Sequence, residues 1–280
     1  MIAVLGGLGA ALAFSITTLV YARASRLLGP AVVTAWVLLV GLVVVLPFAL
    51  AGGLPDRLHG AAIAWLALSG CGNVAGLVLT NAALRRGQVS VVGPIVSTEG
   101  AIAAVIAVLA GEKLAPSSGA VLAVIAMGIV AAGITRSETA AATSAKPAVL
   151  AILAASCFGA SLYATARVGH VLPVVWAVLP ARLIGAVALA APLAVSARLR
   201  LTRAAAPLLV AGGLAEVAGF ASYTLGSRHS VAVAAVIASQ FGGISAVFAF
   251  LLFGERPRRV QVGGIVLIVI GVAVLSAIQS

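Results

Sequence analysis

Charged residues are scarce in this chain of 280 amino acids. They make up 8% of the sequence, whereas apolar residues make up 63%, and a soluble domain usually carries about 25% charged and roughly 45–50% apolar residues. The mean hydropathy is +1.25, which leaves too little polar surface to cover a water-facing globule of this size. The composition therefore excludes an ordinary soluble enzyme, a nucleic-acid-binding module and a disordered chain, and it identifies an integral membrane protein.

Acidic residues and cysteines are rarer still. Six acidic residues against 17 basic ones give a net charge of +11, but the basic residues stand in short gaps between apolar runs, as in loops beside a membrane, rather than along one nucleic-acid-binding face. The two cysteines, Cys71 and Cys157, lie inside apolar runs, so we expect small buried side chains and no disulfide. The chain also begins without the basic segment of a signal peptide, which predicts that its first apolar run is retained.

Long apolar runs of the length that spans a bilayer, about 20 residues, fill most of the sequence. They are continuously apolar and too long for the strands of a β-barrel, so the sequence predicts an all-α membrane protein with ten transmembrane helices. Residues 136–147 are small, polar and proline-terminated, which is typical of a linker. The ten predicted spans are 2–20, 31–52, 60–84, 89–110, 117–135, 148–166, 172–195, 205–226, 231–253 and 260–279.

The two halves of the chain on either side of this linker align with each other. Three anchors share nearly one offset, of 143 or 144 residues: 14–15 with 158–159, 74–76 with 217–219, and 111–113 with 254–256. Because each half carries five spans, an odd number, the second half enters the bilayer from the opposite side. Such inverted repeats are typical of secondary transporters, with the substrate site between the halves near the midplane. We therefore expect two inverted five-helix repeats, residues 1–135 and 148–280, that pack as two bundles around a polar centre.

Several short motifs lead to a family resemblance. They are Phe-Gly-Ala-Ser at 158–161, Asn-Ala-Ala-Leu-Arg-Arg-Gly at 81–87, Ser-Thr-Glu at 97–99, Gly-Glu-Lys-Leu at 111–114 and Phe-Gly-Glu-Arg-Pro at 253–257. In their order, spacing and duplication the chain resembles the drug/metabolite transporter (DMT) superfamily, specifically its ten-helix members built from two EamA-type domains. The resemblance implies transport of amino acids, other metabolites or drugs, usually outward, and both termini in the cytoplasm. The excess of Lys and Arg in the loops after the odd-numbered spans predicts the opposite orientation by the positive-inside rule.

The two halves differ at positions that matter for a shared site. The second half has Gln240-Phe241-Gly242 where the first has Thr98-Glu99-Gly100, and span two has Leu38 where span seven has Arg182. A site built symmetrically from both halves is therefore not expected.

Three charged side chains lie within predicted spans: Glu99, Arg182 and Glu216. A charge at the centre of a span costs roughly 2.5–3.5 kcal/mol on insertion scales, so it is expected to face protein or a water-filled cavity. Glu99 and Glu216 are candidates to bind a substrate amine or to exchange protons, or else to form structural hydrogen bonds. Arg182 is a candidate to bind a substrate carboxylate, or to hold helices together by pairing with Glu99 or Glu216.

Uncharged polar and aromatic residues within the spans complete the predicted substrate site. They are Asn73, which aligns with Glu216, and Tyr163, Trp176 and Gln240; Asn81 and Tyr223 are weaker candidates. Glu112 and Glu255 are predicted to be helix-end carboxylates that pair with Lys113 and Arg256. The three histidines are scattered without metal-binding spacing, and no nucleotide-binding loop is present, so neither a metal nor a cofactor is predicted.

The sequence thus favours a secondary-active transporter of a small organic solute, working by alternating access, rather than an enzyme. The expected partners are the substrate, the lipid bilayer and protons, but no nucleic acid, and monomer and homodimer remain open. The expected location is the cytoplasmic membrane of a bacterium, to which the alanine- and arginine-rich composition points. The alternatives are a lipid-flipping protein and a membrane-embedded enzyme acting on a lipid-linked substrate.

Overall fold

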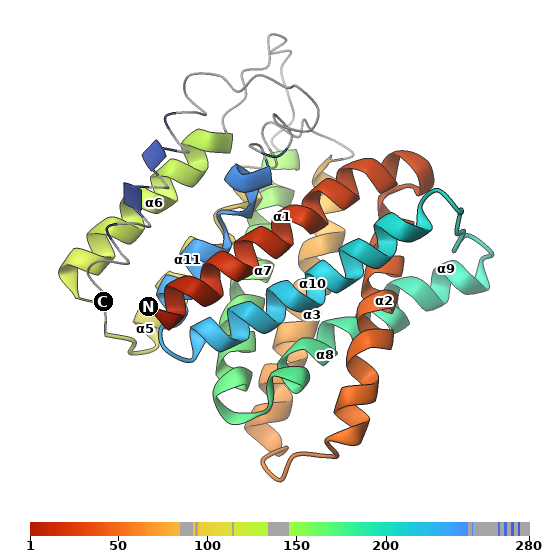
Figure 1. Cartoon of the computed structure of the whole chain (residues 1–280), viewed down its shortest axis with the longest axis horizontal. Coiled ribbons are helices and arrows are strands. Elements are labelled where there is room, and N and C mark those ends of the chain that lie inside the picture. The colour runs from red at the N-terminus through yellow and green to blue at the C-terminus, as the bar shows by residue number, and fades with distance from the viewer. Residues whose placement is uncertain are drawn as a thin grey trace.

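Helices are the regular structure of the described part of the chain (Figure 1). The computed structural model describes residues 1–84, 92, 95–113, 115–133 and 146–245, with isolated positions at 248, 263, 266–267, 270–271 and 274. Six helical segments are long and apolar enough to cross a membrane: α1 (Ile2–Leu28), α2 (Pro30–Ala51), α3 (Gly60–Leu84), α7 (Lys146–Val171), Val174–Val195 and α10 (Ala206–Ser227). Most of the tenth predicted span lies outside the described residues, so the count of ten stays a prediction.

Glycine and proline residues mark the boundary between α1 and α2 and the start of α7. Gly29 ends α1 with a φ of 83°, and Pro30 begins α2; glycine adopts this φ without steric cost, and proline at the first helical position loses no hydrogen bond. The helix α7 begins at Lys146, with Pro147 in its first turn. The last two residues of the predicted linker are therefore helical, and residues 136–145 lie outside the described part.

The segment Val174–Val195 changes its winding halfway. It consists of α8 (Val174–Gly185), the π-helical turn η1 (Ala186–Ala190) and α9 (Ala191–Val195). Ala191 donates its backbone N–H to the oxygen of Ala186, five residues back, and the next residue, Pro192, has no N–H to continue an α-helical ladder. The wider turn lies directly after the segment that carries Arg182, and π-turns are frequent at functional sites.

Predicted spans four and nine are interrupted helices. Span four reaches α5 (Glu99–Leu109) through a turn at Ser97 and Thr98, and span nine leaves α11 (Val231–Ala238) through a turn at Ser239 and Gln240. Each turn closes on the carbonyl three residues back: Thr98 N donates to Ile95 O at 3.2 Å, and Gln240 N to Ile237 O at 3.1 Å. The two interruptions stand at corresponding positions of the two halves, 142 residues apart.

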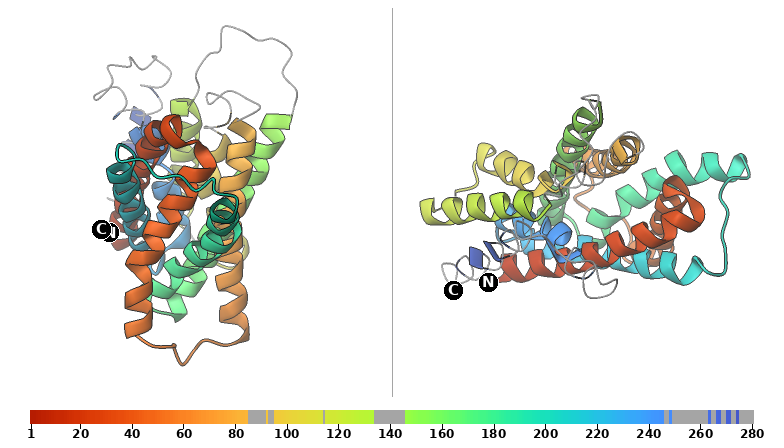
Figure 2. Two further views of the ribbon diagram at one scale, coloured as in Figure 1. Left: turned by 90° about the vertical axis from the view of Figure 1, so that its right-hand side faces the viewer. Right: turned by 90° about the horizontal axis from the view of Figure 1, so that it is seen from above.

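The helices of the two halves interleave, so the expectation that each half packs as its own bundle is wrong. The first bundle comprises α1, α2, α10 and α11, and the second comprises α3, α5, α7 and α8. Figures 1 and 2 show α1 and α10 side by side, with α6 (Pro116–Gly133) at the edge next to α11. Gly6 and Gly226 bring the backbones of α1 and α10 together, since a Cβ at Gly6 would lie 2.5 Å from Gly226 Cα. Small residues permit this close approach in lipid, where apolar side chains alone give helices no reason to associate.

Contacts in one bundle recur at corresponding positions of the other. A Cβ at Gly76 of α3 would lie 2.6 Å from the ring of Phe158 on α7, and a Cβ at Gly219 of α10 would lie 2.5 Å from the ring of Phe14 on α1. The Oγ of Ser161 donates to Ser69 O at 2.7 Å, and its counterpart, the Oγ1 of Thr17, donates to Gly212 O at 3.5 Å. Each pair is related by the offset of 143–144 residues found in the sequence.

Apolar side chains cover much of the outside of the helices, whereas the charged side chains of Glu99, Arg182 and Glu216 are buried inside. Phe48 is 67% exposed and Val187 is 72% exposed, whereas Glu99 and Glu216 are each 8% exposed. This inside-out distribution is the one that a lipid solvent requires.

Candidate functional site

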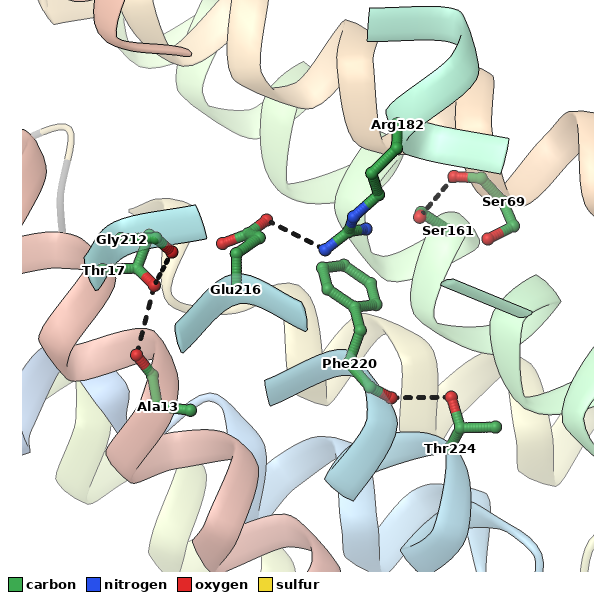
Figure 3. A network of polar contacts seen from close by, with 9 residues as sticks. All are labelled: Ala13, Thr17, Ser69, Ser161, Arg182, Gly212, Glu216, Phe220 and Thr224. Atoms are coloured by element: carbon green, nitrogen blue, oxygen red, sulfur yellow. Dashed lines mark hydrogen bonds and ion pairs between the residues drawn. The ribbon is translucent and has the colours of Figure 1, made fainter. Parts of the chain in front are cut away.

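Arg182 and Glu216 meet in the interior, each near the middle of its membrane-spanning segment. Arg182 comes from α8 of the second bundle and Glu216 from α10 of the first, and the Nη2 of Arg182 lies 4.0 Å from the Oε1 of Glu216 (Figure 3). The arginine is fully buried. The pairing of these two residues was one of the interpretations that the sequence left open, and the structure places the pair across the contact between the bundles.

Two residues from the first bundle shape the surroundings of the guanidinium. The ring of Phe220 lies below it, with its centroid 4.7 Å from Arg182 Cζ, in a cation–π arrangement. On α2, a Cβ at Gly41 would lie 3.3 Å from both Cγ and Nε of Arg182. Gly41 therefore gives the arginine side chain its room between α2 and α10.

The hydrogen-bond donors of Arg182 are unused within the described part of the chain. Its Nε, Nη1 and Nη2 are all buried, and none of them has a hydrogen-bond partner there. Glu216, at 4.0 Å, is too distant for a hydrogen bond, which between charged groups is about 2.7–2.9 Å long. Glu216 thus balances the charge of Arg182 without satisfying its donors.

Glu99 stands at the start of α5, directly after the interruption of span four. It is buried and within electrostatic range of Glu216, and no ion pair involves it among the described residues. The interior therefore holds two carboxyl groups and one guanidinium, with Glu216 in range of both Glu99 and Arg182. Glu99 and Glu216 approach this centre from different bundles.

Aromatic rings connect the arginine with the interruption of span nine. Phe14 of α1 packs edge-to-face on Phe220, with ring centroids 5.3 Å apart, and on Phe241, 6.3 Å apart. The Oγ of Ser15 donates to Phe241 O at 3.0 Å, just past Gln240. The charged pair and the broken helix are thus parts of one continuous interior.

The other predicted site residues are buried or half-buried but lie in different surroundings. Gln240 donates from Nε2 to Val236 O at 3.1 Å, and its Oε1, like the Oδ1 of Asn73, is buried without a hydrogen-bond partner in the described residues. Tyr163 packs edge-to-face on Trp65, with ring centroids 5.7 Å apart, and Trp176 packs on the same apolar clusters as Trp65. The structure brings Tyr163 and Trp176 to these clusters, the first of which also includes Phe220.

Four residues around the charged pair were absent from the sequence prediction: Phe14, Tyr21, Gly41 and Phe220. Phe220 follows Glu216 by four residues and so shares its helix face, a signal that was available. Tyr21, within electrostatic range of Glu216 and Arg182, hydrogen-bonds to Thr34, and the Nδ2 of Asn81 reaches the Oγ1 of Thr34 at 3.5 Å. These residues extend the polar interior towards the ends of α1 and α3.

Glu112 has a structural role that differs from the predicted pairing with Lys113. Its carboxylate accepts hydrogen bonds from Ser230 Oγ at 2.5 Å and from the backbone N–H groups of Val231, at 3.2 Å, and Ala232, at 3.3 Å. These groups form the N-terminus of α11, whose free N–H groups and dipole favour a carboxylate. The corresponding Glu255 lies outside the described residues.

The described residues contain no group of three or more His, Cys, Asp or Glu that could hold a metal ion. What the interior offers instead is one cation, two carboxyl groups and two unsatisfied amide oxygens enclosed by apolar helices. Such a set suits reversible binding of a small polar molecule.

Comparison with known proteins identifies the family of the chain. Residues 1–134 and 145–277 each match the profile of the EamA-like transporter family. The chain belongs to this family. The predicted relation to the EamA-domain members of the DMT superfamily is thereby confirmed, and this EamA-family protein is a multi-pass membrane protein of a transporter superfamily.

Two further comparisons add the extent of the fold. A solved crystal structure resembles the EamA-family chain with a TM-score of 0.78 at 19% sequence identity, over 98% of both chains. At this identity the likeness concerns the fold alone. Among curated proteins, no sequence matches the chain.

Proposed function

We propose that this protein is a secondary-active transporter that moves a small organic solute by alternating access. Its two five-helix repeats, residues 1–135 and 148–280, are inverted relative to each other and joined by the linker at 136–147. The substrate site lies where the two interleaved bundles meet, around Arg182, Glu216 and Glu99, with Asn73 and Gln240 as uncharged partners. Tyr163 and Trp176 line the path to this site.

The recurring contacts support the inverted repeat. Arg182 lies against Gly41, and their counterparts, Leu38 and Gly185, lie against each other at the same crossing of α2 and α8. The two interrupted helices meet in the same reciprocal manner, because Ser97 lies next to Gly242 and Ser239 next to Gly100. A two-fold relation between the halves explains both pairs of contacts, and interrupted helices at matching positions are a mark of transporter binding sites.

The single observation that carries the proposal is the buried Arg182–Glu216 pair across the contact of the two bundles. A charge pair at this depth is costly to bury and gives less stability than good apolar packing. Its position between two bundles that must separate and rejoin supports a functional use.

Unequal packing at the two ends of the bundles fits one state of an alternating-access cycle. At one end α7 meets α10, where Arg228 donates from Nε to Gly169 O at 2.7 Å and from Nη2 to Leu172 O at 3.3 Å. The corresponding helices at the other end, α1 and α3, do not pack closely in the described residues. This packing supports a state of the cycle in which the first end is closed.

Export is the proposed direction and the cytoplasmic membrane of a bacterium the proposed location. The direction follows from the resemblance to the DMT superfamily, and the location from the alanine- and arginine-rich composition. Neither bears on the geometry of the site.

Reconstitution into liposomes tests the proposed function. Vesicles loaded with one unlabelled solute at a time, from a panel of amino acids, organic acids, amines and sugars, should accumulate the same labelled solute by counterflow. Protein-free vesicles are the control, and Arg182→Gln is expected to lower the accumulation. A protein that moves no solute but equilibrates fluorescent lipid between the leaflets would instead be a lipid-flipping protein.

A further inference from the structure

We propose that Arg182 binds a carboxylate group of the transported solute, and that this carboxylate takes the place of Glu216 as partner of the guanidinium. The proposal rests on the proposed transport function and names the chemical class of its substrate. It concerns a single carboxylate, whether on a simple organic acid or on a zwitterion.

The first step is the count of donors on Arg182. A guanidinium has five N–H donors and keeps its charge in proteins, yet none of its three nitrogens has a hydrogen-bond partner in the described part of the chain. An arginine that served only to hold helices together would gain most from short, two-pronged hydrogen bonds to its carboxylate. The separation of 4.0 Å from Glu216 leaves the donors available for another acceptor.

The second step is the shape of the space at the guanidinium. Phe220 covers one face of the group, so the donors that remain lie along its planar edge. Two N–H groups on such an edge match the two oxygens of a carboxylate. Gly41 keeps side-chain atoms of α2 away from the Nε side of the edge, where even a Cβ would come within 3.3 Å.

The third step is charge. Glu216 lies beside Arg182, and Glu99 lies within electrostatic range of Glu216. The single cation can balance the one negative charge of a carboxylate that releases Glu216 from Arg182, but it cannot balance the two negative charges of a phosphate. The charges of the interior therefore favour a carboxylate over a phosphate group.

The fourth step connects binding with movement. Arg182 belongs to the second bundle and Glu216 to the first, so their attraction draws the bundles together. A solute carboxylate that replaces Glu216 removes this attraction at the moment of binding. Occupancy of the site thereby changes the balance between the two states of the transporter, because a ligand shifts an equilibrium through contacts that differ between states.

Binding to the full-length protein in lipid nanodiscs tests the assignment. The probes are matched pairs that differ only in the carboxylate, namely butyrate and butyramide, and alanine and alaninamide, measured by calorimetry and by thermal unfolding. At least one carboxylate should bind and raise the unfolding temperature, and its amide should not. The first pair represents simple acids and the second represents zwitterions.

Variants separate a binding arginine from a structural one. Arg182→Gln should weaken carboxylate binding at least about tenfold, Arg182→Lys less so, and Glu216→Gln should strengthen it because the competing carboxylate is gone. Arg167→Gln, which removes an exposed arginine lying over Trp65, is the matched control and should bind as the unaltered protein does. If Arg182→Gln fails to fold, the carboxylate affinity of Glu216→Gln shows whether Glu216 competes with the solute for Arg182.

Three results would overturn the assignment: equal binding of acid and amide, unchanged binding by Arg182→Gln, or weaker binding by Glu216→Gln. Counterflow separates this failure from that of the proposed function. Transport of amines or sugars without carboxylate binding would overturn the substrate class and leave the transporter standing. Absence of counterflow for every solute would overturn the transporter itself.

Discussion

At the scale of single residues, the crossing of α2 and α8 carries one charged and one apolar version of the same contact. Arg182 lies against Gly41, and Leu38 lies against Gly185. Exchange of leucine for arginine at one of two corresponding positions gives the interior a cation on one side of the pseudo-symmetry axis only. If a solute binds at Arg182 as proposed, the single cation would hold it in one orientation.

We predict that Gly41→Ala impairs solute binding more than Gly185→Ala does. The new Cβ at position 41 would press on the Cγ and Nε of Arg182 at 3.3 Å and displace the guanidinium, whereas at position 185 it would press on the apolar Leu38. Counterflow kinetics should give Gly41→Ala a KM raised about tenfold, since even small misplacement of a binding group is costly. Gly185→Ala is the control for altered helix packing. An equal rise of KM in both variants would contradict a direct role of the guanidinium.

We predict that Glu99 carries the coupled proton. Glu216 has Arg182 as a counter-charge, whereas no ion pair involves Glu99 in the described residues, and a carboxyl without a counter-ion in an apolar interior can shed its charge by binding a proton. Glu99→Gln should therefore abolish the response of transport to a pH gradient imposed between about pH 5 and pH 8, while exchange of solute without a gradient continues. Accumulation that still follows the gradient in Glu99→Gln would exclude proton coupling through this group.

The free-energy cost of burying a charge in lipid identifies Arg182, Glu99 and Glu216 as candidates in the sequence. It does not identify the residues that surround them. Phe220 and Gly41 carry no charge, so insertion cost gives no signal for them, and their role follows from the crossing of helices distant in sequence. Tyr163 and Trp176 were predicted because aromatic residues are conspicuous in an apolar chain, and their place in the substrate site stays a prediction. The structure packs both on the clusters around Trp65.

At the scale of elements, the start of α11 is a helix end whose free N–H groups are capped by side chains. Ser230 Oγ accepts a hydrogen bond from Val233 N at 3.2 Å, and the Glu112 carboxylate accepts hydrogen bonds from the N–H groups of Val231 and Ala232. We predict that Glu112→Ala lowers the free energy of unfolding by about 1 kcal/mol, the usual value of a helix cap, and leaves the KM of the solute unchanged. Thermal unfolding of the purified protein and counterflow kinetics measure the two quantities. Glu112→Gln keeps the acceptor oxygen and should lose less stability, and a changed KM in either variant would give Glu112 a part in binding.

Most helix boundaries follow from the sequence, but the two interruptions do not. The pairs Gly29-Pro30 and Lys146-Pro147 have the conformational preferences that start helices. By contrast, the turns at Ser97-Thr98 and Ser239-Gln240 contain neither proline nor glycine, and single polar residues are common in packed spans. The two turns are recognised as a pair only in the structure, where they contact each other. Ser97 lies against Gly242, and Ser239 lies against Gly100.

At the scale of the whole molecule, the internal alignment predicted which contacts correspond, but it did not predict which helices share a bundle. An offset between two halves is a property of the sequence, and it is the same whether the halves pack separately or interleave. Packing α1 along α10 and α3 along α7 buries the small-residue faces of each against the other half. In the proposed cycle, the moving parts are therefore made of helices from both repeats.

Cross-linking distinguishes motion between bundles from motion between repeats. A Cβ at Gly169 of α7 would lie 3.7 Å from Thr224 Cβ on α10, close to the separation of about 3.8 Å in a disulfide. In a background with Cys71→Ser and Cys157→Ser, we predict that Gly169→Cys with Thr224→Cys forms a disulfide under oxidation and reduces counterflow to background. A reducing agent should restore transport, because the bond holds the two bundles together at the closed end.

The matched control places its disulfide inside one bundle but between the two repeats. A Cβ at Gly9 of α1 would lie 3.2 Å from Ser222 Cβ on α10, so Gly9→Cys with Ser222→Cys requires only a slight adjustment of the helices. Because α1 and α10 belong to the same bundle, this bond should form and leave counterflow intact. The Gly169–Thr224 disulfide joins two bundles within the second repeat, whereas the Gly9–Ser222 disulfide joins the two repeats within one bundle. Movement between bundles and movement between repeats therefore predict opposite results for the two pairs. Loss of transport in the Gly9 and Ser222 pair, or full transport in the oxidised Gly169 and Thr224 pair, would show that other parts of the chain move.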